Sequence, residues 1–461
     1  MGLLDSLAVG RRAIGVASSG IDVTSQNISN VNTVGYTRRK ILQQTPDPAL
    51  RRGVFVGTGV EVSGISRATD RLLNQRLVKS AGQDSHARTL EESLTTVQGL
   101  FNESAFTGMS EAWGAMYDAM SRLTTNPADI SLRRMTVESG RAFASSVSRI
   151  AQGLTDTIGD TDADLTTHAQ QINDNLAEIA TLNSRIARSG YSTGAGDLLD
   201  RRDQLVYSLG ERIGATVSYT EDGQAVVFIG DQAVVDVNDH RQIRIAEDAA
   251  GDAQVYVNAG TGAIRVTESV GGVVGGKLEA RQEMANWLTD LDNFATTFAT
   301  TMNAQHAAGF DAYGAAGGDM FTIAAVGAAA SFDIDPALAA DPNLFATAGA
   351  TPAAVGDTDN LVLLLDTEAA ALYGPAGTLD GSTAISTIIS DVGSTVASAG
   401  VNAEAFGGLL ADLSTMRDSV SQVDTDEEAI KLIEFQAAYR AAARVLQASD
   451  ELLQTLMSIG A

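Results

Sequence analysis

Four histidines have the widest chemical use in this sequence, as bases, acids or metal ligands. They are His86, His168, His240 and His306. No two stand at the short spacing at which one helix or turn presents two ligands, and no HExxH, P-loop, GxGxxG or GxSxG motif is present. His168 falls between Leu165 and Ile172 in an apolar helical pattern, where a polar residue more often sets register than binds a ligand. The sequence therefore predicts neither a metal nor a cofactor.

Carboxylates are the next candidates, as calcium ligands or as catalytic acids and bases. Asp160, Asp162 and Asp164 imitate the opening of a calcium loop, but Leu165 replaces its Gly and Gln171 replaces its final Glu. That loop would lack both its tight turn and its bidentate ligand, so a solvated acidic helix is the better interpretation. Further acids without a partnering catalytic motif are Glu221, Asp222, Asp231, Asp236 and Asp239. We predict that the protein is not an enzyme.

One basic cluster stands out in an acidic chain. It comprises Arg38, Arg39, Lys40, Arg51 and Arg52. Charge runs usually face water, but this cluster could instead meet the acidic run 424–428 across a contact between subunits. The net charge of −26 argues against nucleic acid or anionic lipid as partners, because both reward clustered cations. Absence of cysteine excludes disulfides and thiolate sites, and we expect no signal peptide and no membrane insertion.

Both ends of the chain carry an apolar seam at alternating spacings of three and four residues. The first runs through Leu4, Leu7, Arg11, Ile14, Ser18, Ile21, Ser25 and Ile28. The second runs through Leu432, Phe435, Tyr439, Ala442, Leu446, Ser449, Leu453 and Leu456. This 3.5-residue period is typical of helices that wind around one another. Gly10, Gly15 and Gly20 each weaken the first helix by about 1 kcal/mol relative to Ala, so we expect the two ends to pair with each other and with copies of the chain.

We expect a mainly α fold, with long helical rods, coiled-coil termini and a small antiparallel β insertion. Residues 1–64 and 424–461 should form a terminal assembly domain with the two end helices paired. A helical rod domain should take 65–214, 277–308 and 359–423. A period of two predicts the β insertion over 215–276, and an Ala/Gly-rich stretch predicts loops or a reduced outer domain over 309–358. Thr425 and Glu428 match a capping box at the start of the last helix.

The stretch TSQNISNVNTVGYTR, residues 24–38, closely resembles the N-terminal signature of bacterial flagellar rod, hook and hook-associated proteins. Its pattern is Asn27, then Asn-x-Asn-Thr from Asn30, then Gly35 before an aromatic residue. GYTR at 35–38 is most similar to the family of first hook-associated proteins, at the hook–filament junction. Further matches are INDNL at 172–176, DLLDRRDQL at 197–205, GGKL at 275–278, MNAQH at 302–306 and EFQAAY at 434–439. The resemblance therefore covers nearly the whole chain.

This resemblance implies a structural flagellar protein that polymerises through its terminal helices into a ring of identical subunits between hook and filament. Implied partners are the hook protein, the next junction protein and the filament, and, before assembly, an export chaperone and the type III export apparatus. The implied location is extracellular after a transient cytoplasmic stage. His306, with Asn303 and Gln305, is then a structural feature of a helix end. The alternatives are a hook subunit, the third hook-associated protein or a flagellin, and less so a secreted hydrolase with flagellar-type termini.

The expected assembly interface combines the two seams with the motif. It comprises Leu4, Leu7, Ile14, Ile21, Ile28, Asn27, Asn30, Asn32, Thr33, Gly35, Tyr36, Arg38, Leu432, Phe435, Tyr439, Leu446, Leu453 and Leu456.

Overall fold

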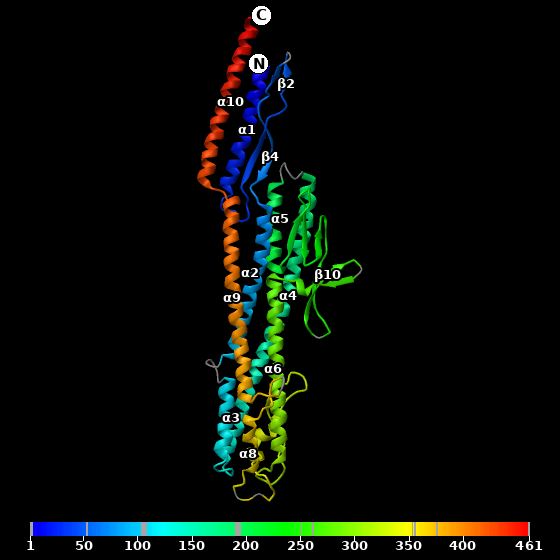
Figure 1. The fold of residues 1–461 in the computed structure, drawn as a ribbon, viewed down its shortest axis with the longest axis vertical. Helices are drawn as coiled ribbons and strands as arrows, with labels where there is room; N and C mark the ends of the chain where they lie inside the picture. The colour runs from blue at the N-terminus through cyan, green and yellow to red at the C-terminus, as the bar shows by residue number, and fades with distance from the viewer. Residues whose placement is uncertain are drawn as a thin grey trace.

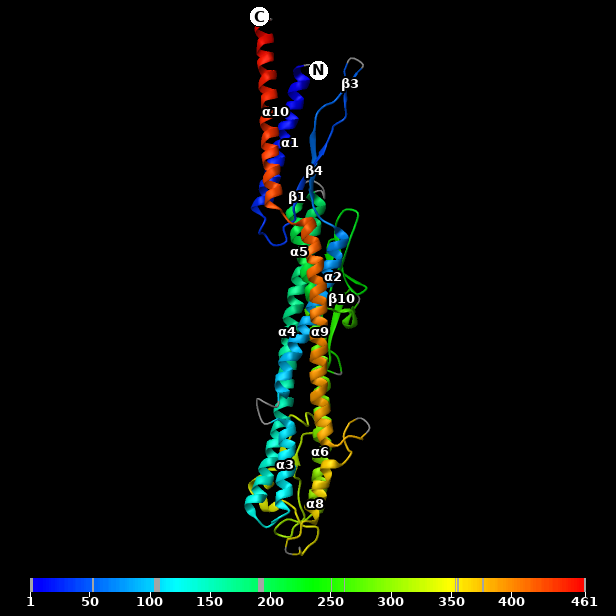
Figure 2. The same ribbon diagram turned by 60° about the vertical axis from the view of Figure 1, so that its left-hand side comes forward.

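The computed structural model shows a long, narrow molecule with both chain ends at one tip (Figures 1 and 2). It describes residues 3–51, 54–102, 108–189, 195–249, 251–260, 262–352, 354, 356–374 and 377–459. The side chains of Leu4 and Leu456 lie outside this description. Helices α1 (Leu3–Ser29) and α10 (Thr425–Ile459) run side by side at the tip, so the first and last segments form one terminal bundle.

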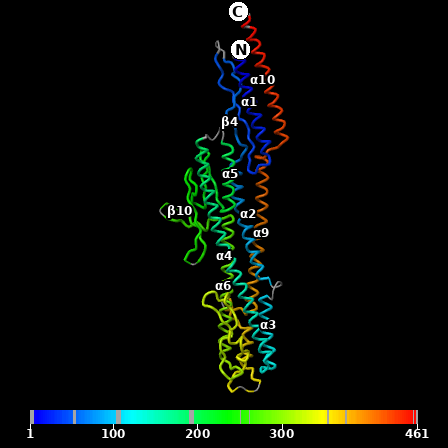
Figure 3. Tube along the Cα trace, turned by 180° about the vertical axis from the view of Figure 1, so that it is seen from behind, coloured from blue at the N-terminus to red at the C-terminus, as the bar shows by residue number. Residues whose placement is uncertain are grey.

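Below this bundle the molecule is a rod of long helices, seen from behind in Figure 3. The fold is mainly α, as the apolar periodicity predicts. Its rod helices are α2 (Arg71–Gln98), α3 (Met109–Leu123), α4 (Ile130–Ser189), α5 (Gly196–Ile213), α6 (Gly272–Ala308) and α9 (Gly381–Ser421). Two short helices, α7 (Pro336–Ala340) and α8 (Asp359–Asp366), belong to the far end of the rod.

The strands form small antiparallel sheets. A hairpin beside α1 pairs β1 with β4 and, further along, β2 with β3; its strands are β1 (Arg39–Gln44), β2 (Ala49–Arg51), β3 (Val54–Val56) and β4 (Glu61–Arg67). One sheet of the insertion has the order β5-β6-β7-β8: β5 (Thr216–Tyr219), β6 (Ala225–Ile229), β7 (Gln232–Asp236) and β8 (Asp239–His240). The other has the order β11-β10-β9: β9 (Ile243–Glu247), β10 (Ala253–Ala259) and β11 (Gly262–Arg265). The short strands β12 (Phe321–Thr322) and β13 (Asp333–Ile334) pair near the rod's far end.

Two hydrophobic cores hold the rod. The core at the far end is aromatic, with Trp113, Phe143 and Phe298 in ring contact and at most 3% exposed. The second core packs one face of α4, including Ile172 and Ile179, against α5 and the β insertion. Because these cores fix the rod independently of the chain ends, the terminal bundle has to be positioned by the segments that connect it.

Two asparagines on α4 attach the β insertion to the rod. The side-chain amide of Asn183 donates to the Ala225 carbonyl at 2.8 Å and accepts from the Ala225 N–H at 3.0 Å. Asn173 makes the same pair of bonds with Ile243, at 2.9 and 2.8 Å. Each amide thus occupies both backbone groups of one residue, as a neighbouring strand would. The matched stretch INDNL supplies Asn173 for this attachment.

One stretch is more apolar than its burial explains. By length and composition alone, Gly381–Thr455 is long and apolar enough to cross a membrane, and 28% of its most apolar window is buried. Its apolar residues are interleaved with small polar ones and form no continuous run, so the expectation of no membrane insertion stays a prediction. Its location, α9 followed by α10, is the outer edge of the rod and terminal bundle.

Candidate assembly site at the chain ends

Small residues on α1 receive large residues from α10. A Cβ at Gly10 would lie 3.0 Å from the Leu446 side chain, and one at Gly20 would lie 2.5 Å from the Phe435 ring. The pairing therefore runs antiparallel, with a residue late in α1 facing one early in α10. Close approach through glycine lets the Phe435 ring lie directly on the α1 backbone.

The predicted C-terminal seam is the face of α10 that packs on α1. Ala442 and Ser449 are buried, and Leu432, Phe435, Leu446 and Leu453 are partly buried, with Tyr439 at the edge of the face at 40% exposed. The buried face of α1, however, is not the predicted seam. It consists of small and β-branched residues and one amide, namely Gly10, Val16, Ala17, Gly20, Val23, Thr24 and Asn27.

The predicted N-terminal seam lies on the neighbouring face of α1. Leu7, Ile14, Ile21 and Ile28 are each partly buried there, and strands β1 and β4 contact the same helix. Gly15 lies on the open side, with no atom within 4 Å of a Cβ placed on it. This face is available to a further partner, and its role in contacts between subunits stays a prediction.

A second apolar face of α10 has no partner among the described residues. Ile430, Ile433 and Leu452 are 60%, 63% and 57% exposed. The face continues through smaller exposed residues at helical spacing, Ala437, Ala441 and Ala448. A third, polar face carries Gln436, Arg440, Gln447 and Gln454. An exposed helix normally has one apolar face, so α10 carries more apolar surface than its packing within the chain uses.

Asn27 is the centre of the motif segment that connects α1 to the hairpin. It is fully buried, and its amide nitrogen donates to the Arg39 carbonyl at 2.9 Å and to a Glu428 carboxylate oxygen at 2.8 Å. Its amide oxygen accepts from the Tyr36 hydroxyl at 2.8 Å and from the Arg39 N–H at 3.0 Å. All four hydrogen-bonding positions of this amide are occupied, so one side chain joins α1, the motif turn and α10.

The rest of the motif shapes the turn. Asn30 accepts from the Thr33 hydroxyl at 3.2 Å, and Asn32 and Thr33 are exposed. Gly35 has a φ of +78°, a left-handed conformation that disfavours a side chain, and Gln204 of α5 lies against it. The Gln204 amide donates to the Val34 carbonyl at 2.6 Å. The turn is thereby attached to the rod.

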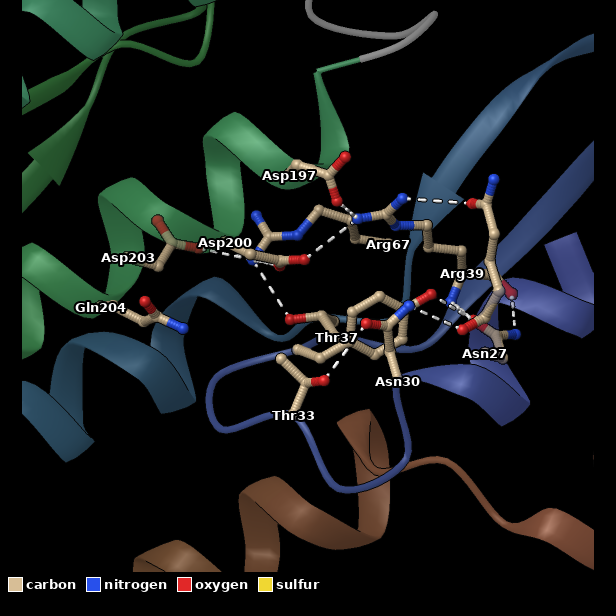
Figure 4. A network of polar contacts seen from close by, with 12 residues as sticks. Asn27, Asn30, Thr33, Thr37, Arg39, Arg67, Asp197, Asp200, Asp203 and Gln204 are labelled. Carbon is tan, nitrogen blue, oxygen red and sulfur yellow. Dashed lines mark hydrogen bonds and ion pairs between the residues drawn. The ribbon is translucent and has the colours of Figure 1, made fainter.

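An ion-pair network connects the motif segment to the rod (Figure 4). We call the contacts of Asn27, the motif turn and this network the motif joint. Arg67 of β4 contacts Asp200 and Asp203 of α5, both at 2.8 Å, and Arg39 contacts Asp197 and Asp200. Burial lowers the pKa of Arg67, but Asp203 and Asp200 outweigh it, so the pKa rises above its ordinary value. Burial raises the pKa of the Asp200 carboxyl, and Arg67 opposes that rise. The DLLDRRDQL match thus supplies the rod's half of the joint.

The basic cluster meets the acidic run inside one chain, whereas the expected contact across subunits stays a prediction. Arg38 pairs with Glu427 of α10, and the Arg38 N–H donates to the Ser421 carbonyl at the end of α9. The side chains of Arg51 and Arg52 lie outside the described residues. Lys431 and Arg38 hold the pKa of the Glu427 carboxyl below its usual range. These contacts tie the motif turn to the hinge between α9 and α10.

The capping box predicted at Thr425 is wrong. Asp424 caps α10 instead, accepting from the N–H groups of Asp426 at 2.9 Å and Glu427 at 3.2 Å. Glu428, 2% exposed, does not reach back to the cap but contacts Asn27 and Lys431. An unpaired acid at this depth would be costly, so its burial requires the amide of Asn27, a partner that is far away in sequence.

A cleft of about 750 Å³ lies beneath the motif turn, between α2, α5 and the end of α9. Its lining includes Arg67, Arg417, Asp200 and Asp418. These charges already pair with one another or with neighbours: Arg67 with Asp200, and Arg417 with Asp418 at 2.6 Å. The cleft therefore offers no free cation or carboxylate among these four for a ligand.

Three other residues considered for chemistry have structural partners. Asp162 pairs with Arg281 at 2.7 Å and Asp164 with Lys277 at 2.9 Å, so α6 supplies the cations for the acidic segment. His168 lies 3.3 Å from the Arg212 guanidinium, and burial followed by Arg212 lowers its pKa. No group of three or more His, Asp or Glu within the described ranges could hold a metal ion.

Comparison with known proteins shows which families have a similar sequence. Residues 94–321 match the model of the flagellar hook-associated protein FlgK helical domain, and residues 418–459 match that of the flagellar basal body rod FlgEFG protein C-terminal region. The chain is 25% identical to flagellar hook-associated protein 1 of Escherichia coli (strain K12), over 97% of this chain and 98% of that protein. It is also 25% identical to the protein of the same name from Bacillus subtilis (strain 168), over 98% and 97%.

A solved structure shares the fold. The flagellar hook junction protein FlgK from Burkholderia pseudomallei superposes with a TM-score of 0.68 at 16% sequence identity. The superposition covers 75% of this chain and 100% of that chain.

Proposed function

Because this chain belongs to the family of flagellar hook-associated protein 1, we propose that it works as a structural subunit of the hook–filament junction whose paired ends pack against copies of itself. The observation that carries this mode of assembly is the open apolar face of α10. The protein's location is the bacterial flagellum, an extracellular appendage. Its family is one of structural proteins.

The open face of α10 has the chemistry of a helix–helix contact. Exposed Ile430, Ile433 and Leu452 recur at spacings of a packed helix, with alanines between them that permit close approach. Covering one isoleucine contributes about 1.5–3 kcal/mol, so burying the face in a neighbouring copy would be strongly favourable.

A complementary face exists on α1. Leu7, Ile14, Ile21 and Ile28 repeat every seven residues, are partly exposed, and lie beside the open Gly15. Within one chain α10 packs on a different face of α1, so the heptad face remains for another copy. We assign the contact between subunits to these two faces, α1 of one copy and α10 of the next.

The motif joint gives this assembly a defined geometry. Its hydrogen bonds and ion pairs connect the terminal bundle to α5 and to the end of α9. Directional polar contacts fix an angle better than apolar packing does, because each is lost when geometry changes. We infer that the joint holds the rod at a set angle to the bundle in the ring.

The remaining partners follow from the family. We assign the hook protein to one side of the ring and the next junction protein and filament to the other. Before assembly, a type III export apparatus and an export chaperone handle the chain, which passes transiently through the cytoplasm. The open α10 face, which needs a cover in solution, is the surface we assign to the chaperone before a neighbouring copy replaces it.

The test compares two substitutions on α10. Ile433→Asp places a charge on the open apolar face, and Gln447→Asp places the same charge on the polar face. Both side chains are exposed in the single chain, so both variants should keep the free energy of unfolding of the monomer within about 0.5 kcal/mol. Incorporation onto purified hooks, followed by flagellin growth, should fail for Ile433→Asp and proceed for Gln447→Asp.

Ile21→Asp extends the test to the α1 face. It should also block incorporation while leaving the melting of the rod unchanged. Normal incorporation of both Ile433→Asp and Ile21→Asp would exclude these faces as the contact between copies. Loss of monomer stability in Ile433→Asp would show instead that the face is covered within the chain.

A further inference from the structure

Side chains from two rod helices fasten the segment after α6 to the far end of the rod. Asn303 donates to the Phe321 carbonyl at 2.8 Å and accepts from the N–H groups of Met320 and Phe321, both at 2.8 Å. Gln305 donates to Asn360 at 2.8 Å, and Asn360 donates to the Ala346 carbonyl at 2.8 Å. We call residues 309–348 the distal segment. It carries buried aromatic residues, so its attachment also closes the far core.

His306 makes the most sensitive of these attachments. It is 1% exposed, at the end of α6. Nδ1 lies 2.7 Å from the Gly318 carbonyl oxygen, and Nε2 lies 2.9 Å from the Ala346 backbone nitrogen. The carbonyl can only accept and the backbone N–H can only donate, so Nδ1 must carry the proton and Nε2 must be bare. A doubly protonated ring cannot make both bonds.

Arg133 of α4 holds the same stretch from the other side. It is 3% exposed and donates to the carbonyls of Pro127 at 2.7 Å and Phe345 at 2.6 Å, and to the Thr347 hydroxyl at 3.0 Å. None of the ion pairs between described residues involves it. A buried cation therefore already lies against the residues on either side of Ala346, and a second positive charge on His306 would be added beside it.

We propose that His306 is an acid-sensitive latch, which docks the distal segment on the rod when neutral and releases it when protonated. Protonation turns the Nε2 acceptor into a donor that faces the Ala346 N–H, and it places a charge on a ring that is 1% exposed. Release breaks the contact with Ala346 and uncovers neighbouring Phe345, which is fully buried and packs on the His306 ring at 5.3 Å.

Several groups around the ring act on this titration. Burial lowers the pKa of His306, while the Gly318 carbonyl and the carboxylates of Asp319, Asp311 and Asp335 oppose that shift. The net pKa lies below its ordinary value of 6.5. A histidine whose folded pKa is depressed favours the docked state above its ordinary pKa, and that preference is lost as the pH falls through the folded value. Acid should therefore open the segment.

Hydrogen exchange on the full chain tests the latch. After correction for intrinsic exchange rates, the opening equilibrium of the distal segment should rise between pH 7.5 and pH 5, by up to about 30-fold if only the released histidine titrates near 6.5. Strands β5 to β7 should show no such rise. The imidazole NMR signals of His306 should titrate with a pKa below 6.5. Binding of a hydrophobic dye should increase with the opening.

Substitutions separate titration from general loosening. His306→Gln retains a donor and an acceptor but cannot titrate, so it should remove the pH dependence, whereas His240→Gln should retain it. Should His306→Gln fail to dock the segment at any pH, Asp319→Asn offers a second route: it removes an exposed charge that favours the imidazolium, and should increase opening at pH 5. Opening that is equal at both pH values in the unaltered chain would refute the latch.

Discussion

Exchanging glycine for alanine at two positions of α1 separates packing within the chain from packing between chains. Gly20 and Gly15 lie in the same helix, where Ala is favoured by about 1 kcal/mol. At Gly20 the added Cβ would lie 2.5 Å from the Phe435 ring, whereas at Gly15 it would meet nothing within 4 Å. Overpacking costs about 1–3 kcal/mol. Gly15→Ala should therefore stabilise the α1–α10 pair by about 1 kcal/mol, and Gly20→Ala should be neutral or destabilising by up to about 2 kcal/mol.

Absence of cysteine from the chain makes the measurement direct. Spin labels on cysteines placed at the exposed positions Arg11 and Gln447 report the distance between the two helices. In urea, the concentration at which that distance distribution broadens should be highest for Gly15→Ala and lowest for Gly20→Ala. Equal midpoints for the two variants would refute the glycine contact. Gly15→Ala has a second outcome, because a copy that packs closely on this face would meet the new methyl group, so incorporation onto hooks should fall while pairing improves.

The joint and the α9 cap give two further predictions. Asn27→Ala leaves Glu428 buried without its amide partner and should cost about 2–4 kcal/mol, seen as faster hydrogen exchange in α1 and early α10; exposed Asn32→Ala is the matched control and should change neither, and equal effects would contradict the joint. Asp380 accepts from the Thr383 N–H at the start of α9, which lowers its pKa to about 2. Its depressed pKa makes this stabilisation complete above about pH 4 and lost as the pH falls towards 2. Asp380→Asn retains the cap and should flatten the pH dependence of unfolding in that window; an unchanged profile would exclude this carboxyl as its source.

The sequence predicts the packed face of α10 well and that of α1 poorly, for one physical reason. Leu432, Phe435 and Leu446 are large, so their period is visible in the sequence. Their receiving positions on α1 are Gly10 and Gly20, which a search for apolar periodicity passes over. The glycines at 10, 15 and 20 in an otherwise helical segment were the available signal, because glycine is costly in a helix unless something packs closely on it. That signal does not separate Gly10 and Gly20 from Gly15, on which nothing packs within 4 Å.

Polar partners that are distant in sequence were beyond prediction. Glu428 fits a local capping role by spacing, and only the fold brings it to Asn27. The same holds for Arg133 and for the alternation of donor and acceptor around His306, because their partners are backbone groups of a segment with no regular period. Long helices follow from local periodicity, whereas joints depend on which ends meet.

The polar joint also settles a question that the apolar seams leave open. Ile14, Ile21 and Ile28 repeat every seven residues, so sliding α1 by seven residues along its partner would bury a similar set of side chains. Such a slip would carry Asn27 away from Glu428 and leave the buried carboxylate with Lys431 but without its amide partner, which costs free energy in every slipped register. It would also bring Ala13 or Asn27 onto the Phe435 ring in place of Gly20. The motif therefore selects one register from several that hydrophobic burial alone would accept, and a repeating assembly needs the same register in every copy.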